Sequence, residues 1–203
     1  MEADNYLTIE NPSQGSYREK GSKFLAFAFP VYDEAEIREK LELLKKKYHD
    51  ARHYCYAWRL GASMEHFRVN DDGEPPNSAG KPILGQIQAF KLTNILIVVV
   101  RYFGGTLLGV GGLIKAYKTA STEALKNARI IDKQILLIYK INFPYSEMNL
   151  IMKVLKEMSL EHFDQNFELN CELKVKVPRF HTVKFINELG LNSKLRIELL
   201  NNK

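Results

Sequence analysis

Residues 93–103, TNILIVVVRYF, contain the longest apolar run of the sequence and predict its central strand. Within this stretch, Ile95 to Val100 is unbroken aliphatic sequence in which five of the six side chains are β-branched. Such a run is expected of a strand that is covered on both faces. We therefore predict a sheet with further structure packed against each side.

A glycine-rich turn follows this strand directly. After Phe103 the sequence reads GGTLLGVGG, and the next segment carries Ala116, Ala120 and Ala124 at every fourth position. Small side chains at this spacing would let a helix lie close to the sheet. The glycines of the turn permit close backbone approach and positive φ angles; they are Gly104, Gly105, Gly109, Gly111 and Gly112.

The turn has the composition of an anion-binding corner. A loop that leaves a buried strand and enters a helix directs unpaired backbone N–H groups outward, and the helix dipole adds to their attraction for phosphate. Arg101, Lys115 and Lys118 would supply the countercharge. Alternatively, the glycines only solve a tight corner and Arg101 is a solvated strand end. The sequence leaves both interpretations open.

Nucleotide cofactors are not expected at this turn. The pattern GxxxxGK[ST] does not occur, and in GxGxxG counted from Gly109 the last glycine is replaced by Ile114. Both patterns depend on their glycine spacing to hold phosphates. We predict that the protein uses no nucleotide or other cofactor.

Aromatic side chains accompany the basic ones at the turn. Tyr102, Phe103 and Tyr117 lie close in sequence to Arg101 and Lys115. This combination is able to stack on the bases of single-stranded RNA and neutralise its phosphates. The same rings could equally belong to the hydrophobic core.

A second group of candidate residues lies in a loop of turn formers, residues 70–82, NDDGEPPNSAGKP. Asp71, Asp72 and Glu74 could hold magnesium or share a proton as an acid/base pair, with His53 in support. Structurally, DDG is also an ordinary turn, and three acids so close in sequence usually point in different directions. We name these four residues as candidates for catalysis and predict no metal site.

Other forms of catalysis have no support in the sequence. There is no GxSxG elbow, and Cys55 alternates with aromatic residues as a buried strand residue does. Cys55 and Cys171 are too far apart in sequence for a CxxC motif, which favours free thiols in a reducing cytosol.

The rest of the chain predicts two domains. Asp33 is a plausible N-cap for a helix whose apolar positions continue to Tyr48. From about residue 134 the pattern restarts with the order βαββαβ, typical of a small ferredoxin-like domain. The expected elements are strand 134–143, helix 146–158, two strands within 160–177 that break near Glu168, helix 179–189 and strand 193–200.

Composition limits the class of protein only loosely. The 203 residues include 29 Lys and Arg against 24 Asp and Glu, a net charge of +5 that permits nucleic acid binding but does not demand it. The N-terminus lacks an apolar signal core, and the longest apolar run is too short to span a bilayer. We expect a soluble cytoplasmic protein without a membrane partner.

Six segments together resemble the YigZ/IMPACT family. They are GSKFLA near the start, HYCYAWRL, DDGEP followed by AGKPIL, VVRYFGG and LGVGGLIKAY. The resemblance covers about residues 15–130, and the βαββαβ tail is similar to the second domain of bacterial YigZ-like proteins. The chain departs from the family at Pro76, Asn77 and Ser78, which replace a Ser-Gly-Thr-like stretch, and at Lys115, which replaces a common Arg.

This resemblance implies an α+β protein linked to translation. Residues 1–134 would form a domain like domain 2 of ribosomal protein S5. Residues 135–203 would form a ferredoxin-like domain similar to a module of elongation factor G. Both relatives belong to the translation machinery, so the implied partners are RNA, the ribosome or translation factors.

Three functional hypotheses follow. The first is a regulatory protein that binds RNA, the ribosome or a translation component through the surface from Gly104 to Lys118. The second is a hydrolase of unknown substrate that uses Asp71, Asp72 and Glu74. The third is a regulator that binds only other proteins.

Overall fold

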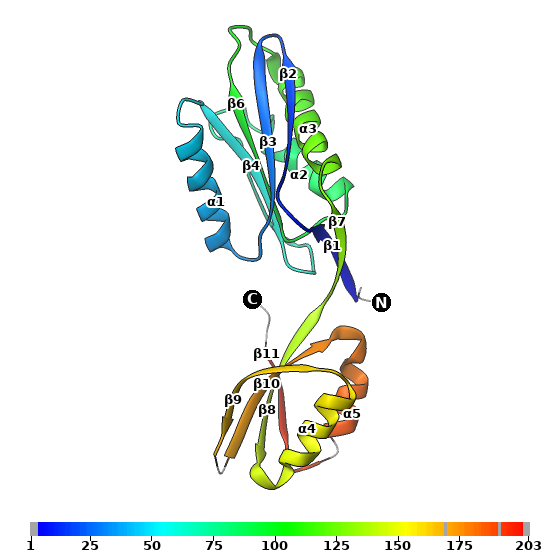
Figure 1. Ribbon diagram of the computed structural model, residues 1–203. Coiled ribbons are helices and arrows are strands. Elements are labelled where there is room, and N and C mark those ends of the chain that lie inside the picture. The colour runs from blue at the N-terminus through cyan, green and yellow to red at the C-terminus, as the bar shows by residue number, and fades with distance from the viewer. Residues whose placement is uncertain (1–3, 169, 191, 201–203) are drawn as a thin grey trace. The chain divides into compact units, whose positions relative to one another are not determined.

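The computed structural model describes residues 4–168, 170–190 and 192–200. The chain divides into two compact units (Figure 1). The N-terminal unit is Tyr6–Lys133. The C-terminal unit holds the described residues from Gln134 onward together with Asp4 and Asn5. In the described part of the chain, no helix is both long and apolar enough to cross a membrane.

A five-stranded antiparallel sheet forms the frame of the N-terminal unit. Its spatial order is β2-β3-β6-β4-β5, which places β6 at the centre as predicted from the run at residues 93–103. The strands are β2 (Ser13–Glu19), β3 (Ser22–Pro30), β4 (His53–Leu60), β5 (His66–Asn70) and β6 (Ile95–Tyr102).

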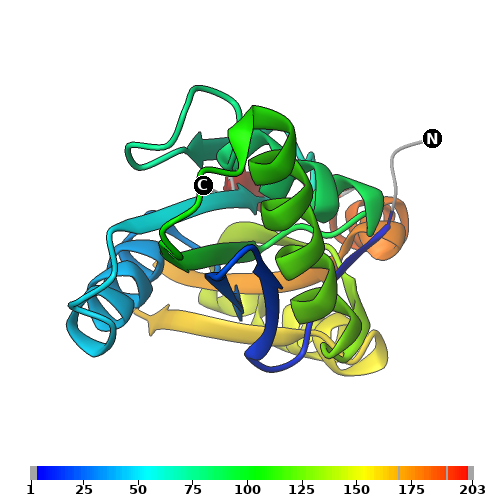
Figure 2. The same cartoon turned by 90° about the horizontal axis from the view of Figure 1, so that it is seen from above.

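Both faces of this sheet are covered, because successive side chains of β6 enter different cores. Ile97 and Val99 pack beneath α2 (Gly80–Ala89) and α3 (Gly109–Lys126). Val98 and Val100 belong to the core that α1 (Glu34–Lys47) covers. Figures 1 and 2 show α1 on one side of the sheet and α3 on the other. The two-sided burial explains why the strand is apolar throughout rather than alternating.

The two long helices begin in different ways. Asp33 caps α1, and its carboxylate accepts hydrogen bonds from the backbone N–H groups of Ala35 and Glu36, both at 2.8 Å. This N-cap was predicted from the sequence. The N-cap position of α3 is Leu108, which makes no side-chain capping bond. The first turn of α3 therefore presents N–H groups that have no side-chain acceptor in the described part of the chain.

Two features of the N-terminal unit were not predicted. Helix α2 begins at Gly80, inside the segment that we expected to be an irregular loop. Strands β1 (Asn5–Ile9) and β7 (Ile130–Gln134) pair as a small two-stranded sheet, although more than a hundred residues separate them. Such pairings between distant segments leave no local pattern in the sequence.

The C-terminal unit has the predicted βαββαβ order. Its four antiparallel strands are arranged as β11-β8-β10-β9. One core joins sheet and helices, with Ile141 and Val175 of the sheet packed against Phe185 of α5. Short 3-10 turns at 145–147 and 179–181 precede the helices. The elements are β8 (Leu136–Pro144), α4 (Met148–Glu157), β9 (Glu161–Phe167), β10 (Asn170–Pro178), α5 (Thr182–Gly190) and β11 (Arg196–Leu200).

Candidate functional site

The glycine turn connects the end of β6 to the start of α3. Gly105 and Gly109 have φ angles of +87° and +69°, a region that favours glycine. Gly104 lies against the β2–β3 turn, where a side chain at this position would overlap the backbone of Gly21 and Ser22. The Gly104 N–H donates to Ser22 Oγ at 3.1 Å. The glycines therefore allow the chain to pass close to the backbone of the β2–β3 turn and then to enter the uncapped start of α3.

The predicted cations divide into two groups. Lys115 and Lys118 lie exposed on α3 and form no ion pair within the described residues. Arg101 does not face solvent, although we had considered it a solvated strand end or a phosphate ligand. It is 5% exposed, and its Nη1 donates to Glu74 Oε1 at 2.5 Å. The turn thus offers backbone N–H groups and two free lysines, with the arginine engaged elsewhere.

The aromatic residues of the turn do not form one stacking surface. Tyr117 is fully buried, and the Tyr102 hydroxyl donates to Asp50 Oδ1 at 2.7 Å. Phe103 alone of the three is exposed, and the Arg101 guanidinium lies over its ring, 5.7 Å from the centroid. Tyr117 belongs to the core, as the alternative interpretation of these rings held.

The two aspartates of the acidic loop hold the loop in place. Asp71 accepts hydrogen bonds from the backbone N–H groups of Asn77, Ala79 and Gly80 at 2.8–2.9 Å, and so stabilises the start of α2. Asp72 accepts a hydrogen bond from the Tyr54 N–H at 2.6 Å. Their carboxylates therefore bind different backbone segments and do not converge.

His53 binds the backbone of this loop rather than an acid side chain. Its Nδ1 lies 2.8 Å from the Asp72 carbonyl oxygen. Asp71, Asp72 and His53 therefore each contact a part of the backbone and are not grouped as a catalytic site. Among residues 4–168, 170–190 and 192–200, no three His, Cys, Asp or Glu side chains are grouped so that they could hold a metal ion.

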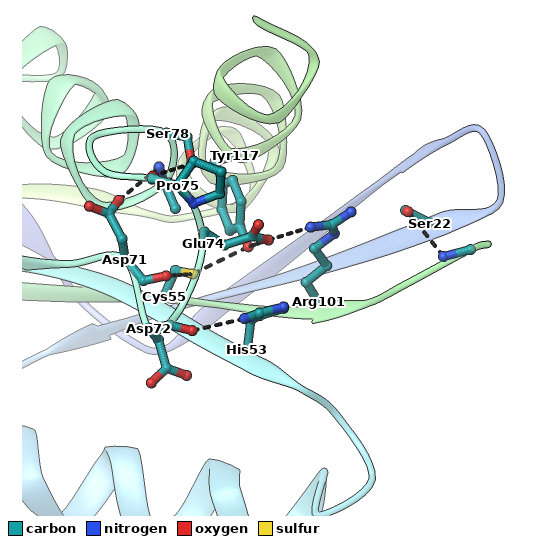
Figure 3. A network of polar contacts seen from close by, with 12 residues as sticks. Ser22, His53, Cys55, Asp71, Asp72, Glu74, Pro75, Ser78, Arg101 and Tyr117 are labelled. Atoms are coloured by element: carbon teal, nitrogen blue, oxygen red, sulfur yellow. Dashed lines mark hydrogen bonds and ion pairs between the residues drawn. The ribbon is translucent and has the colours of Figure 1, made fainter. Parts of the chain in front are cut away.

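Glu74 is the centre of a buried polar network (Figure 3). One of its oxygens, Oε1, accepts hydrogen bonds from Arg101 and, at 2.7 Å, from the Tyr117 hydroxyl. The Cys55 thiol lies 3.2 Å from the Tyr117 hydroxyl oxygen and 2.9 Å from the Asp71 carbonyl oxygen. The network thus joins the acidic loop to β4, β6 and α3.

Burial shapes the chemistry of this network. It raises the pKa of the Cys55 thiol and that of the Tyr117 hydroxyl well above their ordinary values, so both groups stay protonated. The Arg101 guanidinium also lies over the ring of Phe24, 5.4 Å from its centroid, while its Nε is buried without a hydrogen-bond partner among the residues that the structure describes. A buried thiol and phenol of this kind are poor nucleophiles.

Sequence reasoning named Glu74 and Arg101 but assigned them to different sites. One signal could have joined them: an arginine that continues a doubly buried strand requires a nearby acid, because a buried charge is unstable without a partner. The sequence does not reveal which acid supplies it. Tyr117 and Cys55 were both considered, but not as members of the same network.

Comparisons with known proteins agree on the class of this molecule. Residues 20–125 match the family model "Impact N-terminal domain". The chain is similar to an IMPACT family member of Haemophilus influenzae, at 32% identity over 89% of this chain and 90% of the relative. It is also similar to the IMPACT family member YigZ of Escherichia coli, at 31% identity over 89% and 90%.

A solved structure extends the similarity over both units. A crystal structure titled as that of a hypothetical protein is 28% identical and covers 99% of this chain and 100% of its own, with a TM-score of 0.79. The chain is thus a mixed protein of strands and helices that carries an Impact N-terminal domain. The chain belongs to the IMPACT family, and the resemblance noted from its motifs is confirmed.

Proposed function

We propose that this protein regulates translation by binding RNA, the ribosome or another translation component through the surface from Gly104 to Lys118. Membership of the IMPACT family supports the link to translation. The predicted likenesses to domain 2 of ribosomal protein S5 and to a module of elongation factor G point the same way. We therefore expect the target to belong to the translation machinery.

The observation that carries this proposal is the open start of α3. The helix is 18 residues long, has no side-chain cap and has no acidic residue in its first turn. Its N-terminal N–H groups and partial positive charge favour a negatively charged group. Lys115 and Lys118, exposed and unpaired within the described residues, lie one and two turns further along the same helix.

The hydrolase alternative receives less support. Asp71 and Asp72 hold backbone N–H groups, and Glu74 is paired with Arg101 inside the core. A catalytic acid or base must reach the proton that it transfers. These contacts occupy the carboxylates in other ways, so binding is the function that the geometry favours.

Ribosome sedimentation tests the proposal. The purified protein would be centrifuged with ribosomes at low and moderate salt, as wild type and as the double variant K115A/K118A. We expect the variant to lose association, and on single-stranded RNA the salt dependence to weaken by about 0.7 in log–log slope for each lost phosphate contact.

A matched control has the same change of charge elsewhere. Lys45 and Lys46 lie on the last turn of α1, on the opposite face of the sheet, and are also exposed. K45A/K46A should sediment like wild type. If K115A/K118A and K45A/K46A bind equally well, the proposed surface is wrong; if wild type does not bind at all, the proposed function is wrong.

A further inference from the structure

Exposed apolar side chains gather at the glycine turn. Phe103, Leu107, Val110 and Ile114, here called the turn patch, are 43%, 83%, 52% and 38% exposed. They are four of the fifteen large hydrophobic residues that are exposed in the described part of the chain, and they fall within twelve positions. Single exposed hydrophobic residues are ordinary, whereas a concentration of them marks a contact surface.

The geometry of α3 directs part of this patch outward. Leu113, Ala116 and Tyr117 are buried against the sheet, so the helix is firmly seated on that side. Val110 and Ile114 are four residues apart and lie on the same exposed side, where Lys118 follows at the same spacing. Leu107 stands on the turn itself, between the two glycines of positive φ, Gly105 and Gly109.

Three exposed lysines border the turn patch. Lys115 and Lys118 continue the exposed side of α3, and Lys20 lies in the β2–β3 turn, whose Gly21 packs against Gly104. None of these three lysines forms an ion pair within residues 4–168, 170–190 and 192–200. An apolar centre with an uncompensated basic rim is complementary to a partner with an apolar centre and an acidic rim.

The chemistry of the patch favours protein over nucleic acid. Base recognition relies on aromatic rings or guanidinium planes for stacking. Three of the four side chains of the turn patch are aliphatic. The fourth, Phe103, is the one exposed aromatic ring of the patch, and the Arg101 guanidinium lies over it. Tyr117 and Arg101 are buried and cannot stack on a base. Aliphatic side chains gain most by contact with other apolar side chains.

We propose that the turn patch is the docking site for an acidic, amphipathic protein segment, whose apolar side chains cover Leu107, Val110 and Ile114. The carboxylates of that segment pair with Lys20, Lys115 and Lys118. This inference rests on the proposed use of the Gly104–Lys118 surface and names the chemistry of its partner. RNA bound at the same place is the competing outcome.

Three labelled probes distinguish these outcomes by fluorescence anisotropy. The first is a helical peptide of about 20 residues, with leucines every third or fourth position and glutamates elsewhere. The second has the same leucines with lysines in place of the glutamates. The third is polyuridylate RNA. We expect the acidic peptide to bind wild type at least about tenfold more tightly than the lysine peptide.

Variants assign the contact to the patch. L107S/V110S changes two well-exposed side chains and should weaken the acidic peptide about tenfold or more, as expected for central apolar contacts. K115A/K118A should weaken it as well and make it less sensitive to salt. The control L43S removes an apolar side chain of similar exposure, 50%, from α1 on the opposite face of the sheet and should bind like wild type.

The peptides need no ribosome, so this inference and the proposed function can fail separately. Equal binding of the two peptides, or binding of neither, overturns the inference. So does polyuridylate binding that L107S/V110S weakens, because the patch would then contact RNA. If the wild-type protein does not sediment with ribosomes but binds the acidic peptide, the proposed function is wrong and the inference stands.

Discussion

Replacing Glu74 by Gln should strongly destabilise the N-terminal unit. Glu74 and Arg101 are 8% and 5% exposed, and their side chains form a direct ion pair. The glutamine amide oxygen can still accept hydrogen bonds from Arg101 and from the Tyr117 hydroxyl, so the substitution removes the charge and keeps the shape. Since arginine cannot lose its proton in proteins, its charge is left buried without a counter-charge.

The expected cost follows from this burial. Removing one partner of a buried ion pair typically lowers the free energy of unfolding by about 3–5 kcal/mol. A whole domain is stable by only about 5–15 kcal/mol, so E74Q should remove a large fraction of the total. The exposed pair Lys40–Glu39 provides the contrast, because E39Q should cost no more than about 1 kcal/mol.

Urea unfolding followed by tryptophan fluorescence measures this effect. Trp58 is the only tryptophan of the chain, is 4% exposed and lies in the N-terminal unit, so its signal reports on that unit. The double variant E74Q/R101M removes the unpaired charge and should be more stable than E74Q alone. The reasoning fails if E74Q costs less than about 1 kcal/mol, or if R101M brings no recovery in the E74Q background.

Further predictions concern the turn, the thiol and pH. Gly104→Ala should lower the free energy of unfolding by about 1–3 kcal/mol, because the added methyl group overlaps the backbone of Gly21 and Ser22. Gly111→Ala, whose added methyl group meets no described atom within 4 Å, should raise the free energy of unfolding by about 0.5–1 kcal/mol. Urea unfolding measures both effects. In a C171S background, iodoacetamide should modify Cys55 only after unfolding, because burial raises its pKa; rapid native-state labelling would contradict this. The hydrogen bond to Asp50 raises the pKa of Tyr102 from 10 to about 12, so its stabilising contribution is present below pH 10 and is lost as pH rises towards 12. Tyr102→Phe should flatten this alkaline loss in pH-dependent unfolding, and an unchanged slope would count against the bond.

Local sequence patterns were sufficient for much of the fold. The central strand was visible at residues 93–103 because both of its faces are buried, which leaves no polar alternation. Asp33 predicted the start of α1, because a capping carboxylate lies next to the N–H groups that it binds. The βαββαβ order of the C-terminal unit was visible for the same reason, since each element has its own local periodicity. Helix α2 was missed because its start lies among turn-forming residues.

The candidate site depended more on tertiary structure. The glycine turn was found from its composition, yet its exposed apolar side chains became evident only when α3 was seated on the sheet, which separates buried Leu113 from exposed Val110 and Ile114. The sequence alone therefore suggested only a glycine-rich turn with basic residues that could bind phosphate. The folded turn adds an apolar surface beside these residues.

The sequence by itself determined the strand, the glycine turn and the helix that follows, because these features depend on neighbours in the chain. Only the tertiary structure decided the role of Arg101. Its partner Glu74 comes from a loop 27 residues earlier, brought beside β6 when Asp71 stabilises α2 and Asp72 binds β4. A long-range ion pair of this kind is selected by packing and desolvation, which no local pattern records.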